Sequence, residues 1–286
     1  MRPYAPEGPI PFALGPRAYD LAERALVMGI LNRTRDSFYP PAATFELDDF
    51  LARAEALVAA GADLLDVGGV KAGPGEPVSE AEELERVVPA VEALVARFSV
   101  PVSVDTWRAA VAEAAFAAGA WLGNDISGFA DPAYLEVAAR AGASVVATHI
   151  RLAPRVPDPD PHYDDVTRAV ADFLTERRDR ALAAGVAPER IVLDAGLDLG
   201  KTTAHSLTLL RDSPELAALG SPLLLSASNK TFLGDLFGLA VTERREASLA
   251  AVALGVLGGC RILRVHDVAG TVRVRDALAA LEGAAR

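Results

Sequence analysis

Lysine is nearly absent from this chain of 286 residues, because only three of its 28 basic residues are lysine: Lys71, Lys201 and Lys230. Acidic residues number 39, which gives a net charge of −11. Such a chain lacks the basic surface that is typical of nucleic-acid-binding proteins, so we expect no nucleic-acid partner. A general preference for arginine explains why lysine is scarce. It does not explain where lysine remains.

Cysteine and long apolar runs are scarce as well. The single cysteine, Cys260, excludes a disulfide framework and a cysteine-rich metal site. No apolar run approaches the length of a membrane span, and the N-terminus carries no secretory signal pattern. With 51% hydrophobic and 23% charged residues, the composition is that of an ordinary globular protein. We therefore expect a cytoplasmic protein that does not bind a membrane.

The hydrophobic pattern changes character along the chain. Residues 1–24 are rich in proline and glycine, and we expect an irregular leader with a short strand near Pro11–Leu14. From Leu26 onward, short apolar runs alternate with longer stretches of helical period. The apolar runs are residues 26–31, 63–68, 101–105, 121–125, 144–149, 191–194, 222–228 and 261–265. Helical stretches include 47–60, 79–97, 107–118, 163–184, 242–257 and 272–281.

Eight strand–helix units in strict alternation predict a parallel sheet. Eight such units in about 260 residues match the size of a closed (β/α)8 TIM barrel, an α/β fold. The composition shows no break, so we expect one domain over residues 25–286. An open, doubly wound sheet is the structural alternative. In a TIM barrel the active site lies at the C-terminal ends of the strands.

Each apolar run ends in polar or ionisable residues. These are Asn32, Asp66, Asp105, Asn124, Asp125, His149, Asp194, Ser228, Lys230, Arg264 and His266. Helix capping explains any one of them, Asp66 and Asp125 above all. A barrel, however, would bring all eight ends into one pocket. Carboxylates and amides suit a flat heterocycle with donors and acceptors, and the cations suit a phosphate, so we expect a ring-plus-phosphate substrate. A weakly held Mg²⁺ shared with phosphates is the only metal that this pattern suggests.

The segment from Ala195 to Thr202 offers a competing interpretation, because it matches a relaxed phosphate-binding loop, A-x4-G-K-T, after an apolar run. The match lacks the first glycine, and Asp198 would place a negative charge inside the loop. The eightfold repeat also belongs to a different architecture, so a nucleotide hydrolase is the less favoured hypothesis.

Taken in order, the motifs resemble those of the dihydropteroate synthase family over nearly the whole chain. The first-loop signature is MGILNRTRDSF (28–38), followed by GADLLDVGG (61–69), SVDTWRAAVAEAA (103–115) and NDISG (124–128). DAGLDLGKT (194–202), SNKTFLG (228–234) and RVHD (264–267) complete the series. The family joins a pterin methyl diphosphate to 4-aminobenzoate and releases pyrophosphate, a step of folate biosynthesis.

The resemblance implies a role for each matching residue. Asp105, Asn124, Asp194 and Lys230 would bind the pterin, Arg264 and His266 would bind the diphosphate, and Asn32 would do so through Mg²⁺. Asp36, on the first loop, would stabilise the cationic pterin methylene, so that Asp36 and Lys230 would be the catalytic residues. The resemblance also implies a homodimer formed through late helices.

Several positions depart from the family pattern. In the second loop the family's Thr and Arg are Ala72 and Gly73, and Lys71 stands just before them. Asp198-Leu199 replaces Gly-Phe, and Asn229 replaces Arg. These changes resemble those of a divergent second paralogue that is regarded as lacking synthase activity.

Three hypotheses follow from the motifs. The first is a working synthase with altered loops. The second is a pterin-binding or regulatory paralogue without that activity. The third is a related barrel enzyme that acts on another pterin, such as a methyltetrahydrofolate methyltransferase. Arg264 and His266 disfavour it, since a methylfolate has no diphosphate. Lys71 could replace the missing arginine if it points into the pocket.

Overall fold

The computed structural model describes residues 4, 6, 8–34, 46–73 and 75–284. Within them, eight parallel strands close into a barrel in the order β10-β3-β4-β5-β6-β7-β8-β9. The strands are β3 (Leu26–Asn32), β4 (Leu64–Gly68), β5 (Val102–Asp105), β6 (Leu122–Asp125), β7 (Ser144–Thr148), β8 (Ile191–Asp194), β9 (Leu223–Leu225) and β10 (Cys260–Val265). The predicted TIM barrel is confirmed, and the open sheet is wrong.

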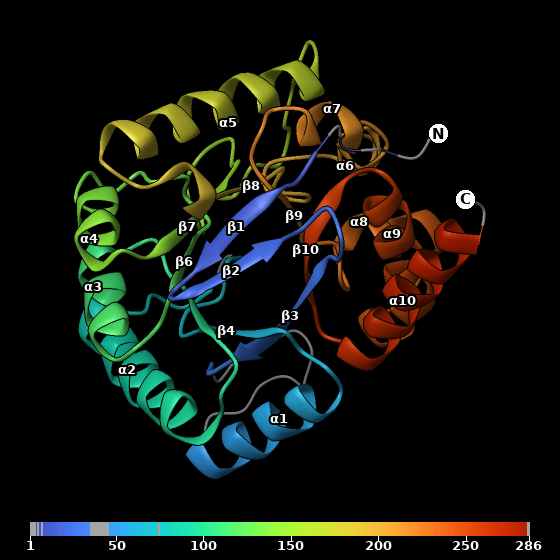
Figure 1. Cartoon of the computed structure of the whole chain (residues 1–286). Coiled ribbons are helices and arrows are strands. Elements are labelled where there is room, and N and C mark those ends of the chain that lie inside the picture. The colour runs from blue at the N-terminus through green and yellow to red at the C-terminus, as the bar shows by residue number, and fades with distance from the viewer. Residues whose placement is uncertain (1–3, 5, 7, 35–45, 74, 285–286) are drawn as a thin grey trace.

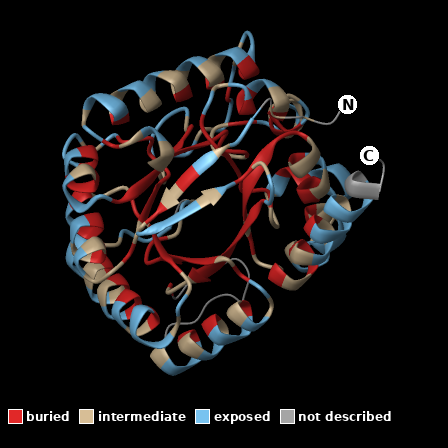
Figure 2. Cartoon of the chain, in the orientation of Figure 1, coloured by how far each residue is buried: buried red, intermediate tan, exposed pale blue. Residues whose placement is uncertain are grey.

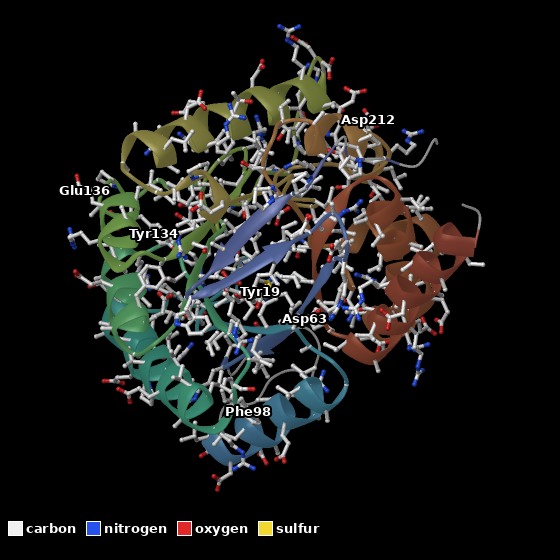
Figure 3. The ribbon with its side chains drawn as sticks, viewed as in Figure 1. Tyr19, Asp63, Phe98, Tyr134, Glu136 and Asp212 are labelled. Carbon is white, nitrogen blue, oxygen red and sulfur yellow. The ribbon has the colours of Figure 1, made fainter. Side chains whose placement is uncertain are left out.

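Helices surround the barrel as a ring (Figure 1). They are α1 (Leu47–Ala59), α2 (Glu80–Arg97), α3 (Ala109–Ala117), α4 (Tyr134–Ala141), α5 (Val166–Ala183), α6 (Thr203–Arg211), α7 (Ser213–Ala217), α8 (Thr231–Phe237), α9 (Arg245–Leu257) and α10 (Val268–Ala284). On the outer helices of the ring, the buried residues face the barrel and the exposed residues face outward (Figure 2). On α4, Tyr134 is fully buried on the barrel side whereas Glu136 lies exposed at the outer edge (Figure 3).

The start of the chain forms an antiparallel hairpin, β1 (Pro11–Leu14) and β2 (Arg17–Asp20). The strand expected near Pro11–Leu14 is therefore present, and it pairs with a second strand that the sequence did not suggest. The hairpin crosses the middle of the ring in Figure 1, where Figure 3 labels Tyr19 of β2. Phe12 and Leu14 are buried in it.

The barrel interior is an apolar layer that the hairpin covers. Phe12, Leu14 and Leu21 form one cluster with an inward-facing residue from most strands: Leu26, Met28, Leu64, Leu122, Val146, Val192, Leu224 and Ile262. A second, larger cluster lies between the strands and the helices. Because side chains of a strand alternate between its two faces, the next inward position lies two residues further along. That position leads to the candidate site.

Candidate active site

The second inward layer of the barrel is polar. Four strands carry an ionisable or amide side chain two residues after an apolar inward residue: Asp66 after Leu64, Asn124 after Leu122, Asp194 after Val192 and Arg264 after Ile262. Asp105 follows the buried Ser103 in the same way on β5. Alternation along parallel strands therefore places these groups together at the C-terminal mouth of the barrel, as the sequence predicted.

Arg264 holds two carboxylates at this mouth. Its Nε donates to Asp66 Oδ2 at 2.6 Å, and one terminal nitrogen donates to Asp105 Oδ2 at 2.7 Å. Burial opposes the charge of the guanidinium, but Asp66 and Asp105 raise the pKa of Arg264 above its ordinary value. Burial raises the pKa of Asp105 to about 7, a shift that Arg264 opposes and Asp66 reinforces. One cation and two acids thus share the floor of the pocket.

Asp66 belongs to this floor, although the sequence left it between a cap and a site residue. Its carboxylate is fully buried and also accepts from Ser103 Oγ at 2.5 Å and from Asn124 Nδ2 at 3.1 Å. Asp125 is the contrasting case, because its carboxylate accepts from the backbone N–H groups of Ser127 and Phe129 and so caps a turn. Asp66 shares the inward register of Leu64, whereas Asp125 directly follows the inward Asn124. The alternation of inward and outward positions along a strand therefore distinguishes the site residue Asp66 from the capping residue Asp125.

Asp194 and Lys230 lie on the opposite side of the mouth, at the end of β8 and at the start of α8. The Asp194 carboxylate accepts from Gly196 N–H at 2.8 Å, and burial raises its pKa. Lys230 Nζ donates to the Leu197 carbonyl at 2.7 Å, and burial lowers its pKa. Both charged groups are held by the loop that follows β8.

His266 faces a small cleft beside the floor. Its Nδ1 lies 3.0 Å from Ser228 Oγ, and its carbonyl accepts from Arg53 of α1 at 3.1 Å. Burial, with Arg264 and Arg53 nearby, lowers the pKa of His266 to about 3, so the ring is neutral at pH 7. The cleft has a volume of about 240 Å³ and is lined by Arg53, Arg245, Ser228, Asn229, Ser248, His266 and Asp267 among others. Among the described residues, the buried Nε of Arg53 has no hydrogen-bond partner. This cleft can hold an anion.

Asn32 ends β3 beside Gly68, which separates it from Asp105 in the sheet. A Cβ on Gly68 would lie 3.4 Å from Asn32 Oδ1 and 3.7 Å from Asp105 Oδ2, so the two oxygens border the same spot. No group of three His, Cys, Asp or Glu residues within the described ranges could hold a metal ion. Asp36 lies in 35–45, outside the described residues, so its predicted role stays a prediction.

The second loop is tied down from two sides. Arg86 of α2 donates to the Gly69 carbonyl at 2.8 Å, and Arg155 donates to the Glu76 carbonyl at 2.6 Å. Lys71 lines a cleft with Arg86 and Arg155, whereas Ala72 and Gly73 line a neighbouring cleft with Asp198 and Leu199. Arg155 lines both clefts. Arg155, which the sequence did not suggest, therefore places a cation beside the positions of the missing Thr and Arg.

Lys201 does not belong to a phosphate-binding loop. Its Nζ is buried and contacts His149 Nδ1 at 2.8 Å and the Gly196 carbonyl at 2.9 Å. A phosphate-binding lysine must reach out to its ligand, so the nucleotide-hydrolase interpretation of residues 195–202 is wrong. His149, another strand-end residue, is buried in the same contact.

Residues 28–266 match the family described as pterin binding enzyme. The chain belongs to this family. A protein of Mycobacterium leprae named "Inactive dihydropteroate synthase 2" is 47% identical over 268 residues, which cover 92% of each chain. The dihydropteroate synthase of Synechocystis is 40% identical over 94% of this chain and 96% of its own. The solved structure of the Yersinia pestis dihydropteroate synthase with a sulfonamide drug complex has a TM-score of 0.91 and 40% identity, and covers 96% of this chain and 100% of that one.

The family assignment agrees with the resemblance read from the motifs, and it identifies the chain as a member of the dihydropteroate synthase group of transferases. It is also compatible with both a working synthase and an inactive paralogue, because some relatives are named dihydropteroate synthase and others inactive dihydropteroate synthase 2. In the part of the chain that the structure describes, no helix is both long enough and apolar enough to cross a membrane.

Proposed function

We propose that this protein transfers the methylene carbon of 6-hydroxymethyl-7,8-dihydropterin diphosphate to the amine of 4-aminobenzoate and releases pyrophosphate. The observation that carries the proposal is the polar layer at the barrel mouth. It brings Asp105, Asn124 and Asp194 together with Lys230 and Arg264 at one end of a pterin-binding barrel. In the reaction the C–O bond to the diphosphate breaks and a C–N bond forms. The leaving group takes the electron pair, and the amine loses a proton.

The pocket can recognise a pterin ring through complementary hydrogen bonds. Asp105 and Asp194 would accept from N–H groups of the ring, and Asn124 presents an amide that both donates and accepts. Lys230 Nζ, which already donates to the Leu197 carbonyl, has two further N–H groups for ring acceptors. Arg264 holds Asp105, Asp66 holds Asn124, and the loop backbone holds Asp194 and Lys230, so these groups are oriented before the ring binds.

The diphosphate would lie toward Arg264, His266 and the cleft beside them. Arg53 Nε supplies a buried donor in that direction, and the neutral His266 can donate one hydrogen bond. Asn32 Oδ1, close to Asp105, suits Mg²⁺, which takes oxygen ligands and usually keeps several waters and phosphate oxygens. When bound, Mg²⁺ would neutralise the negative charge that develops on the departing pyrophosphate. We further propose that Asp36 stabilises the methylene cation, as the family pattern implies.

A second candidate function is a pterin-binding protein without synthase activity. Ala72 and Gly73 offer no side-chain donor to a second substrate, and the relative from Mycobacterium leprae is named as inactive. In that case the pterin pocket would be retained for binding alone.

An assay of dihydropteroate formation from the pterin diphosphate, 4-aminobenzoate and Mg²⁺ separates the two functions. We expect turnover by the wild type above the rate without enzyme, and none by Lys230→Ala. Folded wild-type protein that binds the pterin diphosphate without turnover would establish the second function instead. Folded protein that does not bind it would overturn both.

We also propose that the protein is a cytoplasmic homodimer that uses its late helices. Leu236 and Phe237 at the end of α8 and Leu254 of α9 are 41%, 66% and 45% exposed, which gives these helices apolar surface to pair. Sedimentation at several concentrations tests this, since a monomer at all of them would contradict it.

A further inference from the structure

The loop after β8, residues 195–200, sets the direction of two pterin-facing groups. Its Gly196 N–H donates to the Asp194 carboxylate at 2.8 Å, and its Leu197 carbonyl accepts from Lys230 Nζ at 2.7 Å. The Asp198 carboxylate in turn accepts from the N–H groups of Thr231 and Phe232 at the start of α8. If this loop changed its path, both Asp194 and Lys230 would lose a fixed partner.

The other side of the loop surrounds Lys201. The ammonium group has three hydrogens, and three acceptors lie within 3.1 Å: His149 Nδ1 at 2.8 Å, the Gly196 carbonyl at 2.9 Å and the Leu199 carbonyl at 3.1 Å. Lys201 is 8% exposed and His149 is 5% exposed. The carbonyls at 196 and 199 thus turn inward to the ammonium, while the carbonyl at 197 turns outward to Lys230.

The backbone fits closely around this contact. Gly196 has φ +64, and a Cβ there would lie 1.9 Å from the His149 carbonyl oxygen, so only glycine lets the loop pack against β7. Burial lowers the pKa of His149 to about 3, so the imidazole stays neutral and can accept at Nδ1. Burial also lowers the pKa of Lys201, whereas the nearby carboxylates of Asp194 and Asp198 oppose this shift.

We propose that Lys201 is a positioning residue for pterin recognition: its buried ammonium, held by His149, folds the 195–200 loop so that Asp194 and Lys230 face the ring. The inference rests on the proposed function, because the pterin pocket is what Lys201 orients. Without the ammonium, the buried Gly196 carbonyl and the half-buried Leu199 carbonyl would lose their donor. The loop would then move to satisfy them, and the Leu197 carbonyl would no longer be held in place for Lys230.

The test is a calorimetric titration of the full chain with two separate probes, 6-hydroxymethylpterin for the ring site and pyrophosphate for the anion site. In Lys201→Met we expect ring affinity to fall about tenfold, the loss expected for misplaced charged hydrogen bonds. Pyrophosphate affinity should change less than about twofold, because the proposed anion site is formed by Arg264, His266 and Arg53, and Lys201 holds none of them in place. A loss of folding alone would lower both affinities together.

A matched control removes another cationic side chain that donates to a backbone carbonyl, at the opposite end of the barrel. Arg190 donates to the Gly15 carbonyl at 2.9 Å and binds the hairpin to the start of β8. Arg190→Met should leave ring affinity unchanged even where it lowers the melting temperature.

His149→Leu provides a second, independent variant, because it removes the Nδ1 acceptor but keeps Lys201. We expect it to lower ring affinity in the same direction, and the double variant to be no weaker than Lys201→Met alone. Unchanged ring affinity in either folded single variant, or equal losses for ring and pyrophosphate, would overturn the inference. If Lys201→Met does not fold, His149→Leu decides alone. Wild-type protein that binds neither probe would instead overturn the proposed function.

Discussion

Arg264 of β10 pairs with two acids that lie far from it in the sequence, Asp66 on β4 and Asp105 on β5. The Asp66 side chain is fully buried and that of Arg264 is 15% exposed. Breaking a buried ion pair by removing one partner is costly, because the other charge stays buried without compensation. At the scale of single residues, the arrangement at the barrel mouth therefore depends on Asp66, to which the family resemblance assigned no role.

Asp66→Asn should lower the free energy of unfolding by about 2–3 kcal/mol, since Arg264 keeps only one charged partner. It should also weaken pterin binding about tenfold, because Arg264 and Asn124 lose their common anchor. Denaturant titration and calorimetry measure the two effects. Asp63→Asn is the control, because Asp63 pairs with Arg275 at the start of β4, away from the mouth. Loss of pterin affinity in both variants would show that stability alone is responsible.

The raised pKa of Asp105 predicts that pterin affinity depends on pH. With its pKa raised to about 7, mainly by burial, the carboxylate is lost as pH falls below that value, and so is an acceptor for ring N–H groups. Pterin affinity should therefore decrease from pH 8 to pH 6 in the wild type and stay flat in Asp105→Asn. The free energy of unfolding of the ligand-free protein should change in the opposite direction. Because the pKa of Asp105 is higher in the folded than in the unfolded chain, the stability that this group provides at low pH is lost as pH rises through about 7. A pH-independent affinity in the wild type would contradict the prediction.

At the scale of elements, the strands could be predicted because each is a short apolar run between turn signals. The run 191–194 coincides with β8, and the run 63–68 begins one residue before β4. The hairpin's second strand, Arg17–Asp20, could not be predicted, since it is largely exposed and carries no alternating pattern. The Lys201–His149 contact could not be predicted either, because it joins residues 52 positions apart through carbonyls that a sequence does not place.

Loop 2 carries the difference between the two candidate functions. Restoring the family residues with Ala72→Thr and Gly73→Arg should raise the rate of dihydropteroate formation about tenfold, since an added charged donor contributes about 1.5–3 kcal/mol. Pterin diphosphate affinity should stay unchanged, because Ala72 and Gly73 line a different cleft, with Asp198 and Leu199. Lys71→Ala in the same assay checks whether Lys71 has taken over the missing role. No gain in rate from the double substitution would show that Ala72 and Gly73 do not limit the activity.

At the scale of the whole molecule, the residues proposed to bind substrate lie at one end of the barrel, and the hairpin that stabilises the apolar layer lies at the other. The hairpin covers the apolar layer at one end, and the polar layer occupies the other. In TIM barrels the C-terminal face carries the active site, and the opposite face serves stability. Substitutions in the hairpin should therefore change the free energy of unfolding and leave binding intact.

Phe12 tests this separation, because it is 1% exposed and packs on the interior cluster. Phe12→Ala should lower the free energy of unfolding by about 3–4 kcal/mol through the cavity it leaves. The affinity for pterin diphosphate should remain within about twofold of the wild type, because the loss is confined to the far end of the barrel. A parallel fall in affinity, in folded protein, would show that the two ends are coupled.

Pterin diphosphate binding is the most direct measurement of the central claim, that the mouth of this barrel holds a dihydropterin diphosphate. Calorimetric titration of the wild type should show saturable binding at one site per chain, and Asp194→Ala and Lys230→Ala should each weaken it about tenfold or more. Folded wild-type protein that does not bind, or variants that bind as tightly as the wild type, would contradict the account.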